Sequence, residues 1–387
     1  EQDYPMDATV GKEGFEYAFE SYLHGKDGRQ CTVLSAEGKV LEEYYDSTPE
    51  AGSNVELTID IDLQKVAEDA LASHIENIRQ NGLSTNSDNN GNGKDAEGGA
   101  VVVISCKDET AGEVLACASY PTYNLATYSQ DFESLLQDEY APLYNRALQA
   151  LYYPGSTYKP VTAIAAVDYL GVNPLAQIED KGIYTAYADD GFTPMCMIYK
   201  NAGATHGDLD MLHALAYSCN YYFYEMADRI YNAANHTLAP VDNVAKAMGL
   251  GESTGVELGE AKGYRANAET KAALYGVDES GFYAADALMA GIGQSENKFT
   301  VLQLATYAAT LANEGTRYRS TFLQRVVSAD YSSLIQENTP QVESELAISS
   351  TAMNAVTEGM KLVATDPAGT AHRTLQDYSI AVCAKTG

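Results

Sequence analysis

A serine and a lysine lie three residues apart within residues 153–159 (YPGSTYK), at the start of a segment with a helical pattern. At this spacing, Ser156 and Lys159 share one face of a helix. A serine hydroxyl becomes a nucleophile when a base lies within hydrogen-bond reach. A lysine amine can be that base if burial or a neighbouring cation lowers its pKa. The pair therefore predicts nucleophilic catalysis through a covalent serine intermediate.

Two further motifs carry groups that suit the same chemistry. Ser218 and Asn220, in Ser-Cys-Asn, would supply a hydroxyl to relay protons and an amide to hold a substrate or the lysine. Lys385, Thr386 and Gly387 follow an apolar run; the cation and hydroxyl could bind a carboxylate, and the glycine would let backbone approach a ligand. Together the motifs predict an acylation site with a subsite for a carboxylate.

Each motif alone is weak evidence, because the chain repeats two of them elsewhere. Ser295 and Lys298 also fit Ser-x-x-Lys, and Ser-x-Asn recurs at 84–86, 87–89 and 295–297. The order is more specific: Ser-x-Asn begins 62 residues after Ser156 (218 minus 156), and Lys-Thr-Gly, found once, begins 167 residues later (385 minus 218). The ordered set is therefore much stronger evidence than any member.

Periodicity predicts the elements that must position these residues. A polar, glycine-rich stretch at 81–99 is expected to be a solvated loop. Asp60 or Asp62 is the expected N-cap of the first long helix. The expected strands are 55–59, 100–105, 113–118 and 380–383, and the expected helices are 15–23, 63–71, 161–169, 211–227 and 302–312. This pattern predicts an α+β domain with one sheet covered by helices and the 100–118 hairpin at its centre.

The charge of the chain argues against polyanionic partners. Its 24 basic and 54 acidic residues give a formal net charge of -30, which argues against nucleic acid and against an anionic membrane surface. No apolar run is long enough to span a membrane.

Cysteine and histidine spacing gives no sign of a metal site. The six cysteines lack CxxC spacing and the six histidines lack HExxH or HxH spacing. We therefore predict no metal and cysteines that are mostly free and buried. Cys219, inside the second motif, is expected to be a spectator.

In these motifs the chain resembles the transpeptidase domain of class B penicillin-binding proteins, over nearly its whole length. Supporting stretches are 57–64, 99–103, 118–121, 145–147, 206–207, 291–294 and 303–313, and residues 11–28 resemble the family's linker segment. The resemblance implies a penicillin-binding protein or serine β-lactamase-like fold, with a central antiparallel sheet covered by helices. It implies a linker or pedestal remnant at 1–52 and a transpeptidase domain at 53–387.

The resemblance also implies residue roles. Ser156 would be the acylated nucleophile and Lys159 its base, Ser218 and Asn220 the second motif, and Lys385 with Thr386 and Gly387 the binder of the substrate's terminal carboxylate. The enzyme would be a serine-type D-Ala-D-Ala transpeptidase that cross-links cell-wall stem peptides, is acylated by β-lactams, and needs no cofactor.

Family membership also implies partners and a location. The partners would be peptidoglycan stem peptides, their lipid-linked precursors, β-lactam antibiotics and a membrane glycan polymerase. The domain would lie on the extracytoplasmic face of the bacterial cell membrane, anchored by an N-terminal helix absent from these residues. The family's remaining strands, terminal helix and second oxyanion donor are expected beyond Gly387.

Two other functions use the same acylation chemistry. A β-lactamase would hydrolyse the acyl-enzyme, and a β-lactam-sensing module would be acylated without turnover. The N-terminal 50 or so residues count against a dedicated β-lactamase, which needs no linker.

Overall fold

The computed structural model describes residues 8–82, 93–279 and 281–387. By its internal contacts the chain divides into two units. The first comprises Glu1–Pro121, Gly255–Glu260 and Arg319–Gln341, and the second comprises Thr122–Thr254, Ala261–Tyr318 and Val342–Gly387. Both units combine helices with antiparallel strands, which confirms the predicted α+β class. All seven residues predicted to form the site belong to the second unit.

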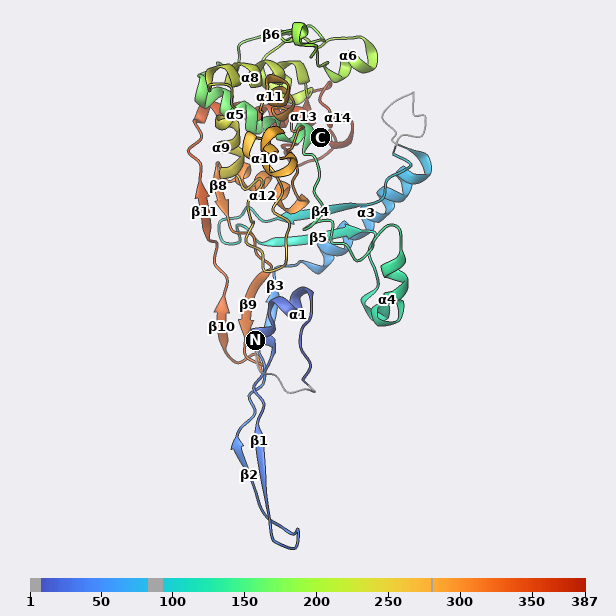
Figure 1. Ribbon diagram of the computed structural model, residues 1–387, viewed down its shortest axis with the longest axis vertical. Coiled ribbons are helices and arrows are strands. Elements are labelled where there is room, and N and C mark those ends of the chain that lie inside the picture. The colour runs from blue at the N-terminus through green and yellow to red at the C-terminus, as the bar shows by residue number, and fades with distance from the viewer. Residues whose placement is uncertain (1–7, 83–92, 280) are drawn as a thin grey trace. The chain divides into compact units, whose positions relative to one another are not determined.

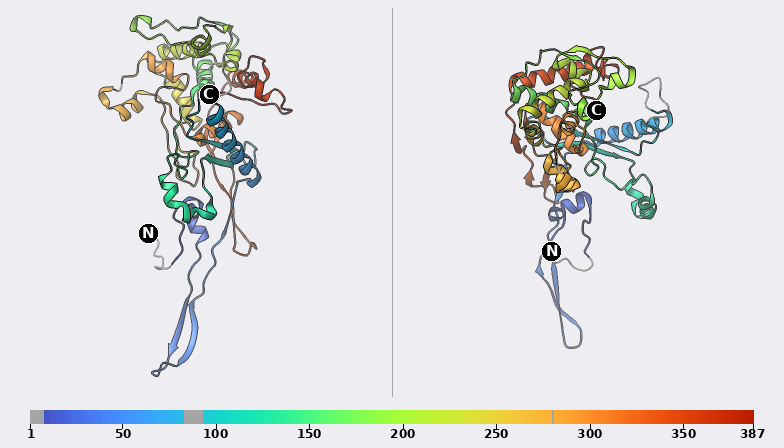
Figure 2. Two further views of the ribbon diagram at one scale, coloured as in Figure 1. Left: turned by 90° about the vertical axis from the view of Figure 1, so that its right-hand side faces the viewer. Right: turned by 45° about the horizontal axis from the view of Figure 1, so that its top comes forward.

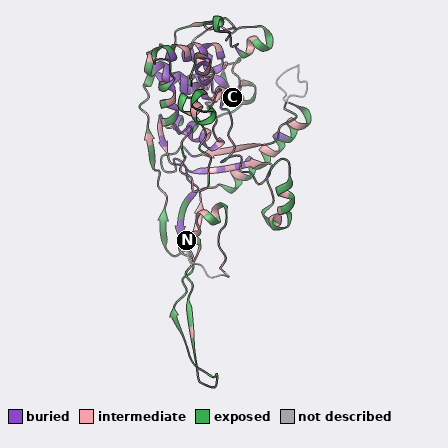
Figure 3. Ribbon diagram, viewed as in Figure 1, coloured by how far each residue is buried: buried purple, intermediate pink, exposed green. Residues whose placement is uncertain are grey.

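The first unit is built mainly from strands (Figure 1). Its elements are α1 (Gly14–Ala18), α2 (Glu20–Leu23), α3 (Ile61–Asn81), β1 (Arg29–Leu34), β2 (Val40–Ser47), β3 (Asn54–Leu57), β4 (Gly99–Ile104), β5 (Val114–Tyr120), β9 (Leu323–Val327) and β10 (Leu334–Glu337). Strands β1 and β2 form a long antiparallel ladder, which stays side by side in both views of Figure 2 and is almost entirely exposed (Figure 3). A second sheet has the order β10-β9-β3.

The predicted hairpin is confirmed as β4 and β5, which pair antiparallel with Val102 opposite Cys117. Helix α3 packs on it: Ala67 is buried with Ala116 and Ala118. The helix begins after Asp60, whose carboxylate accepts hydrogen bonds from two backbone N–H groups of the first turn, so Asp60 is the N-cap.

The second unit is mostly helical. Its elements are α4 (Tyr128–Gln137), α5 (Lys159–Leu170), α6 (Met197–Ala202), α7 (Met211–Ala216), α8 (Asn220–Ala233), α9 (Ala239–Ala247), α10 (Ala268–Tyr275), α11 (Ala284–Ala290), α12 (Val301–Ala312), α13 (Ser350–Thr365), α14 (His372–Leu375), β6 (Ile178–Asp180), β7 (Gly207–Leu209), β8 (Thr316–Tyr318) and β11 (Val342–Glu345). Short 3₁₀ turns lie at Leu125–Thr127, Gly155–Tyr158, Ala188–Asp190 and Val277–Glu279. Strand β6 pairs with β7, and β8 with β11.

Helix α5 is buried on every side from Lys159 to Val167, and most of these residues belong to the main hydrophobic core of this unit. A helix that is apolar all round is stable only inside a core. It packs against α8, α9 and α13, and it ends at Gly171, whose φ of 66° is a left-handed C-cap. The core therefore fixes the first turn of α5, which carries Lys159.

Three predictions of secondary structure are wrong in detail. Residues 380–383 form no strand, because no strand in the described ranges pairs with them; the nearby Ala384 N–H donates instead to Met360 of α13. The predicted helix 211–227 is two helices, α7 and α8, separated at residues 217–219. The described strands form five small sheets and no single central sheet, and the β4–β5 hairpin pairs mainly with itself.

The predicted loop 81–99 falls mostly on residues 83–92, outside the described residues. Among the helices that the structure describes, none is both long and apolar enough to cross a membrane.

Candidate active site

Ser156 lies in the 3₁₀ turn Gly155–Tyr158, directly before α5. Lys159 has helical backbone angles (φ -55°, ψ -35°) although Pro160 follows it. The proline is tolerated because it occupies the first turn of α5, where its missing N–H has no partner to lose. Ser156 is partly exposed and lines an open cleft, whereas Lys159 is fully buried.

Lys159 joins the first two motifs. Its Nζ donates to the Ser218 carbonyl oxygen at 2.7 Å and to Asn220 Oδ1 at 2.7 Å, and it lies 3.2 Å from Ser218 Oγ. Burial, and then the nearby charge of Lys385, lower the pKa of Lys159 well below its ordinary value. The residue therefore has the property that the sequence argument required of a base.

The neutral form of Lys159 has two N–H groups and one lone pair. The Ser218 carbonyl and the amide oxygen of Asn220 can only accept, so the two short bonds use both N–H groups. The lone pair is then left for a hydroxyl donor. Among the described hydrogen bonds none joins Ser156 Oγ to Lys159 Nζ; such catalytic bonds often tighten only when substrate binds.

Ser218 stands between two amines. Lys385 Nζ donates to Ser218 Oγ at 2.9 Å, on which Lys159 Nζ also converges. The backbone of Ser218 has a φ of +57°, a left-handed conformation that is costly for a residue with a Cβ. This conformation interrupts the helix between α7 and α8. The break turns the hydroxyl toward both lysines, so it can pass a proton between them.

The third motif reaches the same place. Burial lowers the pKa of Lys385 to about 7, and its Nζ also donates to the Thr386 carbonyl oxygen at 2.8 Å. Gly387 lines the cleft with Ser156 and Asn220. The Thr386 hydroxyl instead donates to Thr370 Oγ1 at 2.8 Å, so it is engaged outside the lysine cluster. Six of the seven predicted residues therefore line the cleft or join the hydrogen-bond cluster around Ser218.

The competing Ser-x-x-Lys match does not form such a site. Ser295 Oγ donates to Glu296 at 2.5 Å, and Lys298 Nζ lies over the ring of Tyr153, 4.9 Å from its centroid. The two Ser-x-Asn matches at 84–86 and 87–89 lie outside the described residues.

Gly293 supports the turn that carries Ser156, and the sequence analysis assigned it no chemical role. Its carbonyl accepts from the Gly155 N–H at 3.0 Å, and its φ is +78°. A Cβ on Gly293 would lie 2.1 Å from the Gly155 carbonyl oxygen. Only a glycine lets these two segments approach so closely, and the position of Ser156 depends on the contact.

The cleft at Ser156 has a volume of about 650 Å³, within the usual range for ligand sites. One wall is apolar, and Met195, Met197 and Ile292 contribute to it. Met195 and Met197 flank Cys196, which is buried, and the segment continues into α6.

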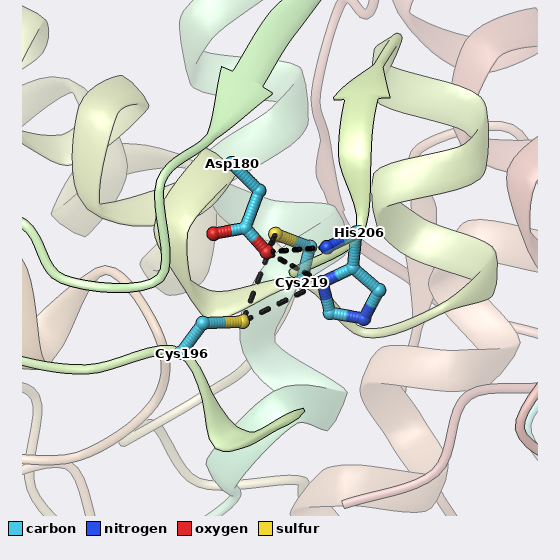
Figure 4. Close-up of side chains that lie close together, drawn as sticks. All are labelled: Asp180, Cys196, His206 and Cys219. Carbon is cyan, nitrogen blue, oxygen red and sulfur yellow. Dashed lines mark hydrogen bonds and ion pairs between the residues drawn. The ribbon is translucent and has the colours of Figure 1, made fainter. Parts of the chain in front are cut away.

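Cys196 and Cys219 belong to a cluster that the sequence prediction missed. Both thiols and Asp180 are buried, His206 is half-buried, and the four possible ligand atoms lie within 4.8 Å of one another (Figure 4). The residues come from the end of β6, the start of α6, the residue before β7 and the start of α8. Their separation along the chain explains why spacing motifs did not reveal them. The expectation that Cys219 is a spectator in the chemistry of the second motif stays a prediction.

The geometry of this cluster suits a tetrahedral metal ion such as Zn²⁺. With bonds of about 2.3 Å to sulfur and 2.0 Å to nitrogen or oxygen, two sulfurs lie roughly 3.8 Å apart and a sulfur lies roughly 3.5 Å from the other donors. The two Sγ atoms are 3.8 Å apart, Cys196 Sγ is 3.6 Å from His206 Nδ1, and Cys219 Sγ is 3.6 Å from Asp180 Oδ2. The 2.7 Å contact of His206 Nδ1 with Asp180 Oδ2 is shorter than such a site allows and would have to lengthen.

The electrostatics of the cluster also favour a cation. The hydrogen bond from Cys219, and a further one with His206, lower the pKa of Cys196 and so favour a thiolate. Burial raises the pKa of Asp180, but hydrogen bonds from His206 and Gly182 outweigh it and leave a net lowering. An ion held here would tie the cleft wall at Cys196 to the second motif at Cys219.

We expect the protein to bind one Zn²⁺ per chain at this cluster. Cys196→Ala should remove that binding and lower the thermal unfolding temperature, because structural zinc stabilises the folded state. The measurements are metal content after dialysis and thermal unfolding with and without a chelator. Cys117→Ala, which removes a half-buried thiol outside the cluster, is the control; equal zinc content in Cys196→Ala and the unmodified protein would contradict the assignment.

The prediction that the cysteines are mostly free and buried is half right. All six are free, as expected, but only Cys196 and Cys219 are buried; Cys106 and Cys383 are exposed.

Comparison with known sequences gives two matches to family profiles. Residues 99–387 match the penicillin-binding protein transpeptidase domain, and residues 1–57 match the penicillin-binding protein dimerisation domain.

Curated relatives include peptidoglycan D,D-transpeptidase MrdA of Haemophilus influenzae, 30% identical over 98% of this chain and 52% of that protein. MrdA of Escherichia coli strain K12 is 27% identical over 100% of this chain and 55% of that protein. The chain spans about half the length of the curated relatives it matches.

Solved structures show the same fold. A chain of a peptidoglycan synthase complex that coordinates polymerisation and crosslinking matches with a TM-score of 0.80 and 27% identity, over 99% of this chain and 61% of that chain. Pseudomonas aeruginosa PBP2 in complex with WCK 5153 matches with a TM-score of 0.74 and 25% identity, over 98% of this chain and 72% of that chain.

Proposed function

This chain belongs to the penicillin-binding protein transpeptidase family, and on that premise we propose that it is a peptidoglycan D,D-transpeptidase. It cross-links cell-wall stem peptides through a serine acyl-enzyme, and β-lactams acylate and inhibit it. Ser156 is the nucleophile, Lys159 the base, Ser218 and Asn220 the second motif, and Lys385 with Thr386 and Gly387 the carboxylate site.

One observation carries the proposal: three motifs far apart in sequence meet at Ser218. A buried amine on one side and a second amine on the other share its hydroxyl, next to a cleft lined by Ser156. Neutral Lys159 and a proton-carrying Lys385 give the base and the anion-binding group that acyl transfer to serine requires.

The chemical steps follow from this arrangement. Ser156 Oγ attacks the carbonyl carbon of the bond between two terminal D-alanines, and its proton passes to the lone pair of Lys159. The proton then passes through Ser218 to the leaving D-alanine amine as the carbon–nitrogen bond breaks. The backbone N–H of Ser156, which makes no hydrogen bond among those of the described residues, is one donor to the developing oxyanion. An amine of a neighbouring strand then takes the acyl group.

The wider assignments rest on the relatives. We infer a linker or pedestal region at 1–52 and a transpeptidase domain at 53–387, which the matches at 1–57 and 99–387 support. The substrates are stem peptides and their lipid-linked precursors. The similar synthase complex supports a membrane glycan polymerase as a partner and the extracytoplasmic face of the membrane as the location.

The function is tested by following two reactions of the purified protein. We expect benzylpenicillin to label Ser156 and to stay attached for many minutes, and a pentapeptide to release D-alanine. Rapid release of the penicilloyl group would indicate a β-lactamase, and persistent labelling without D-alanine release would indicate a sensor. No labelling at all would contradict acyl transfer.

The pH dependence of the acylation rate should follow the protonation of Lys385. Because burial lowers the pKa of Lys385 to about 7, the free protein loses this positive charge as the pH rises through 7. The second-order rate constant for acylation by benzylpenicillin, which carries a carboxylate, should therefore fall between pH 6 and pH 9. In Lys385→Arg the arginine stays charged throughout this range, so the rate constant of this variant should not fall. A profile of the same shape in both proteins would contradict the assigned role.

A further inference from the structure

The active-site cleft carries an uneven distribution of charge. The chain has 54 acidic residues, yet none of the described residues that line this cleft is Asp or Glu. Lys200, in α6, is the one lysine or arginine among them. In so acidic a protein, a cleft free of carboxylates with a single cation on its wall favours an anionic ligand.

Lys200 is available to such a ligand. Its side chain is exposed, and within the described ranges no carboxylate lies within 4.0 Å of its Nζ. Lys181, which belongs to the same unit, differs: it pairs with Glu179 at 3.8 Å and does not line the cleft. Lys385 donates to Ser218 and is assigned to the substrate's terminal carboxylate under the proposed function. Lys200 would therefore bind a second carboxylate.

The backbone that presents Lys200 is fixed. The Lys200 N–H donates to the Cys196 carbonyl at 3.0 Å in the first turn of α6, and the Cys196 side chain points into the buried cluster with Cys219 (Figure 4). Met195 and Met197 stand beside it on the cleft wall. The wall therefore offers a hydrocarbon surface that ends in a cation, which complements an aliphatic side chain that ends in a carboxylate.

We propose that Lys200 selects acyl donors with a second carboxylate, carried on a side chain upstream of the scissile D-Ala-D-Ala bond. The inference rests on the proposed transpeptidase function and names a feature of its substrate: a stem peptide with a free carboxylate on that side chain is preferred to its carboxamide or to one with an amine there. Lys200 is a specificity residue that takes no part in bond making.

The test uses three matched donors, N-acetyl-L-Glu-D-Ala-D-lactate and its Gln and Lys counterparts, with the acylation rate of Ser156 followed by intact-protein mass spectrometry. We expect the unmodified protein to prefer the Glu donor to the Gln donor by about three- to tenfold, as for a partly exposed charge pair. The preference should shrink in high salt. Lys200→Gln should abolish it, and Lys200→Glu should reverse the order of the Glu and Lys donors.

Because each protein is compared with itself on paired donors, a loss of folded protein cancels from the ratio. Lys181→Gln is the control and should keep the preference. Equal rates for Glu and Gln donors in the unmodified protein, or a preference that survives Lys200→Gln, would overturn the inference. Failure of every donor and of benzylpenicillin to acylate Ser156 would instead refute the proposed function on which it rests.

Discussion

Replacing Lys159 with methionine should lower the acylation rate by benzylpenicillin by about 10³- to 10⁴-fold, the upper range for loss of a general base. Methionine is similar in length and apolar, so it fills the buried space but has no lone pair for a serine proton. Stopped-flow fluorescence with a labelled penicillin measures the rate.

The stability of this variant should change far less than its reactivity. Burial lowers the pKa of Lys159, so folding disfavours its charged form, and methionine removes the cost of burying this amine. Against this, the Ser218 carbonyl and Asn220 Oδ1 lose a donor.

The chain supplies a matched control for this variant in its second Ser-x-x-Lys sequence. Lys298→Met removes a lysine that contacts the ring of Tyr153 and lies outside the Ser218 cluster, so acylation should stay within about twofold of the unmodified rate. If Lys159→Met reacted nearly as fast as Lys298→Met, Lys159 would not be the base.

Gly293→Ala should destabilise the protein by about 2–4 kcal/mol, because it combines a left-handed backbone with a steric clash. The new Cβ would lie 2.1 Å from the Gly155 carbonyl oxygen and 2.8 Å from Tyr158 Cβ. The turn that holds Ser156 must shift to relieve this contact, and a displacement of about 1 Å can cost on the order of 10²-fold in rate. Urea unfolding and the acylation rate of the folded fraction measure the two effects.

Gly171→Ala separates backbone strain from the clash. Gly171 has a similar φ of +66°, at the C-cap of α5, but a Cβ there would meet nothing within 4 Å. We expect a loss of about 1–2 kcal/mol and an unchanged acylation rate. Equal behaviour of the two alanine variants would show that the contact between Gly293 and Gly155 does not position the nucleophile.

The sequence could single out the residues that meet around Ser218 because their signals are local. Ser-x-x-Lys at a helix start, Ser-x-Asn after an apolar helix and a single Lys-Thr-Gly can each be recognised in a few residues, and their order joined them. The sequence could not show that Lys159 bonds to Ser218 and Asn220 and Lys385 to Ser218, because those contacts depend on the packing of α5 against α8.

Other features depend on long-range contacts that local patterns do not carry. The helix expected at 211–227 is broken because Ser218 adopts a left-handed backbone at the site, against the helical periodicity of its neighbours. The apolar run 380–383 was predicted as a strand, although a strand also needs a paired neighbour. The cluster of Asp180, Cys196, His206 and Cys219 brings four separate segments together, and no spacing rule connects them.

The most direct test of the account is to locate the covalent bond. The protein is incubated with benzylpenicillin, digested, and mapped by tandem mass spectrometry. We predict a single penicilloyl group on Ser156 and none on Ser218 or Ser295, and no adduct in Ser156→Ala, whose thermal unfolding should match that of the unmodified protein. An adduct on Ser218, or one that persists in Ser156→Ala, would contradict the central claim that Ser156 is the nucleophile.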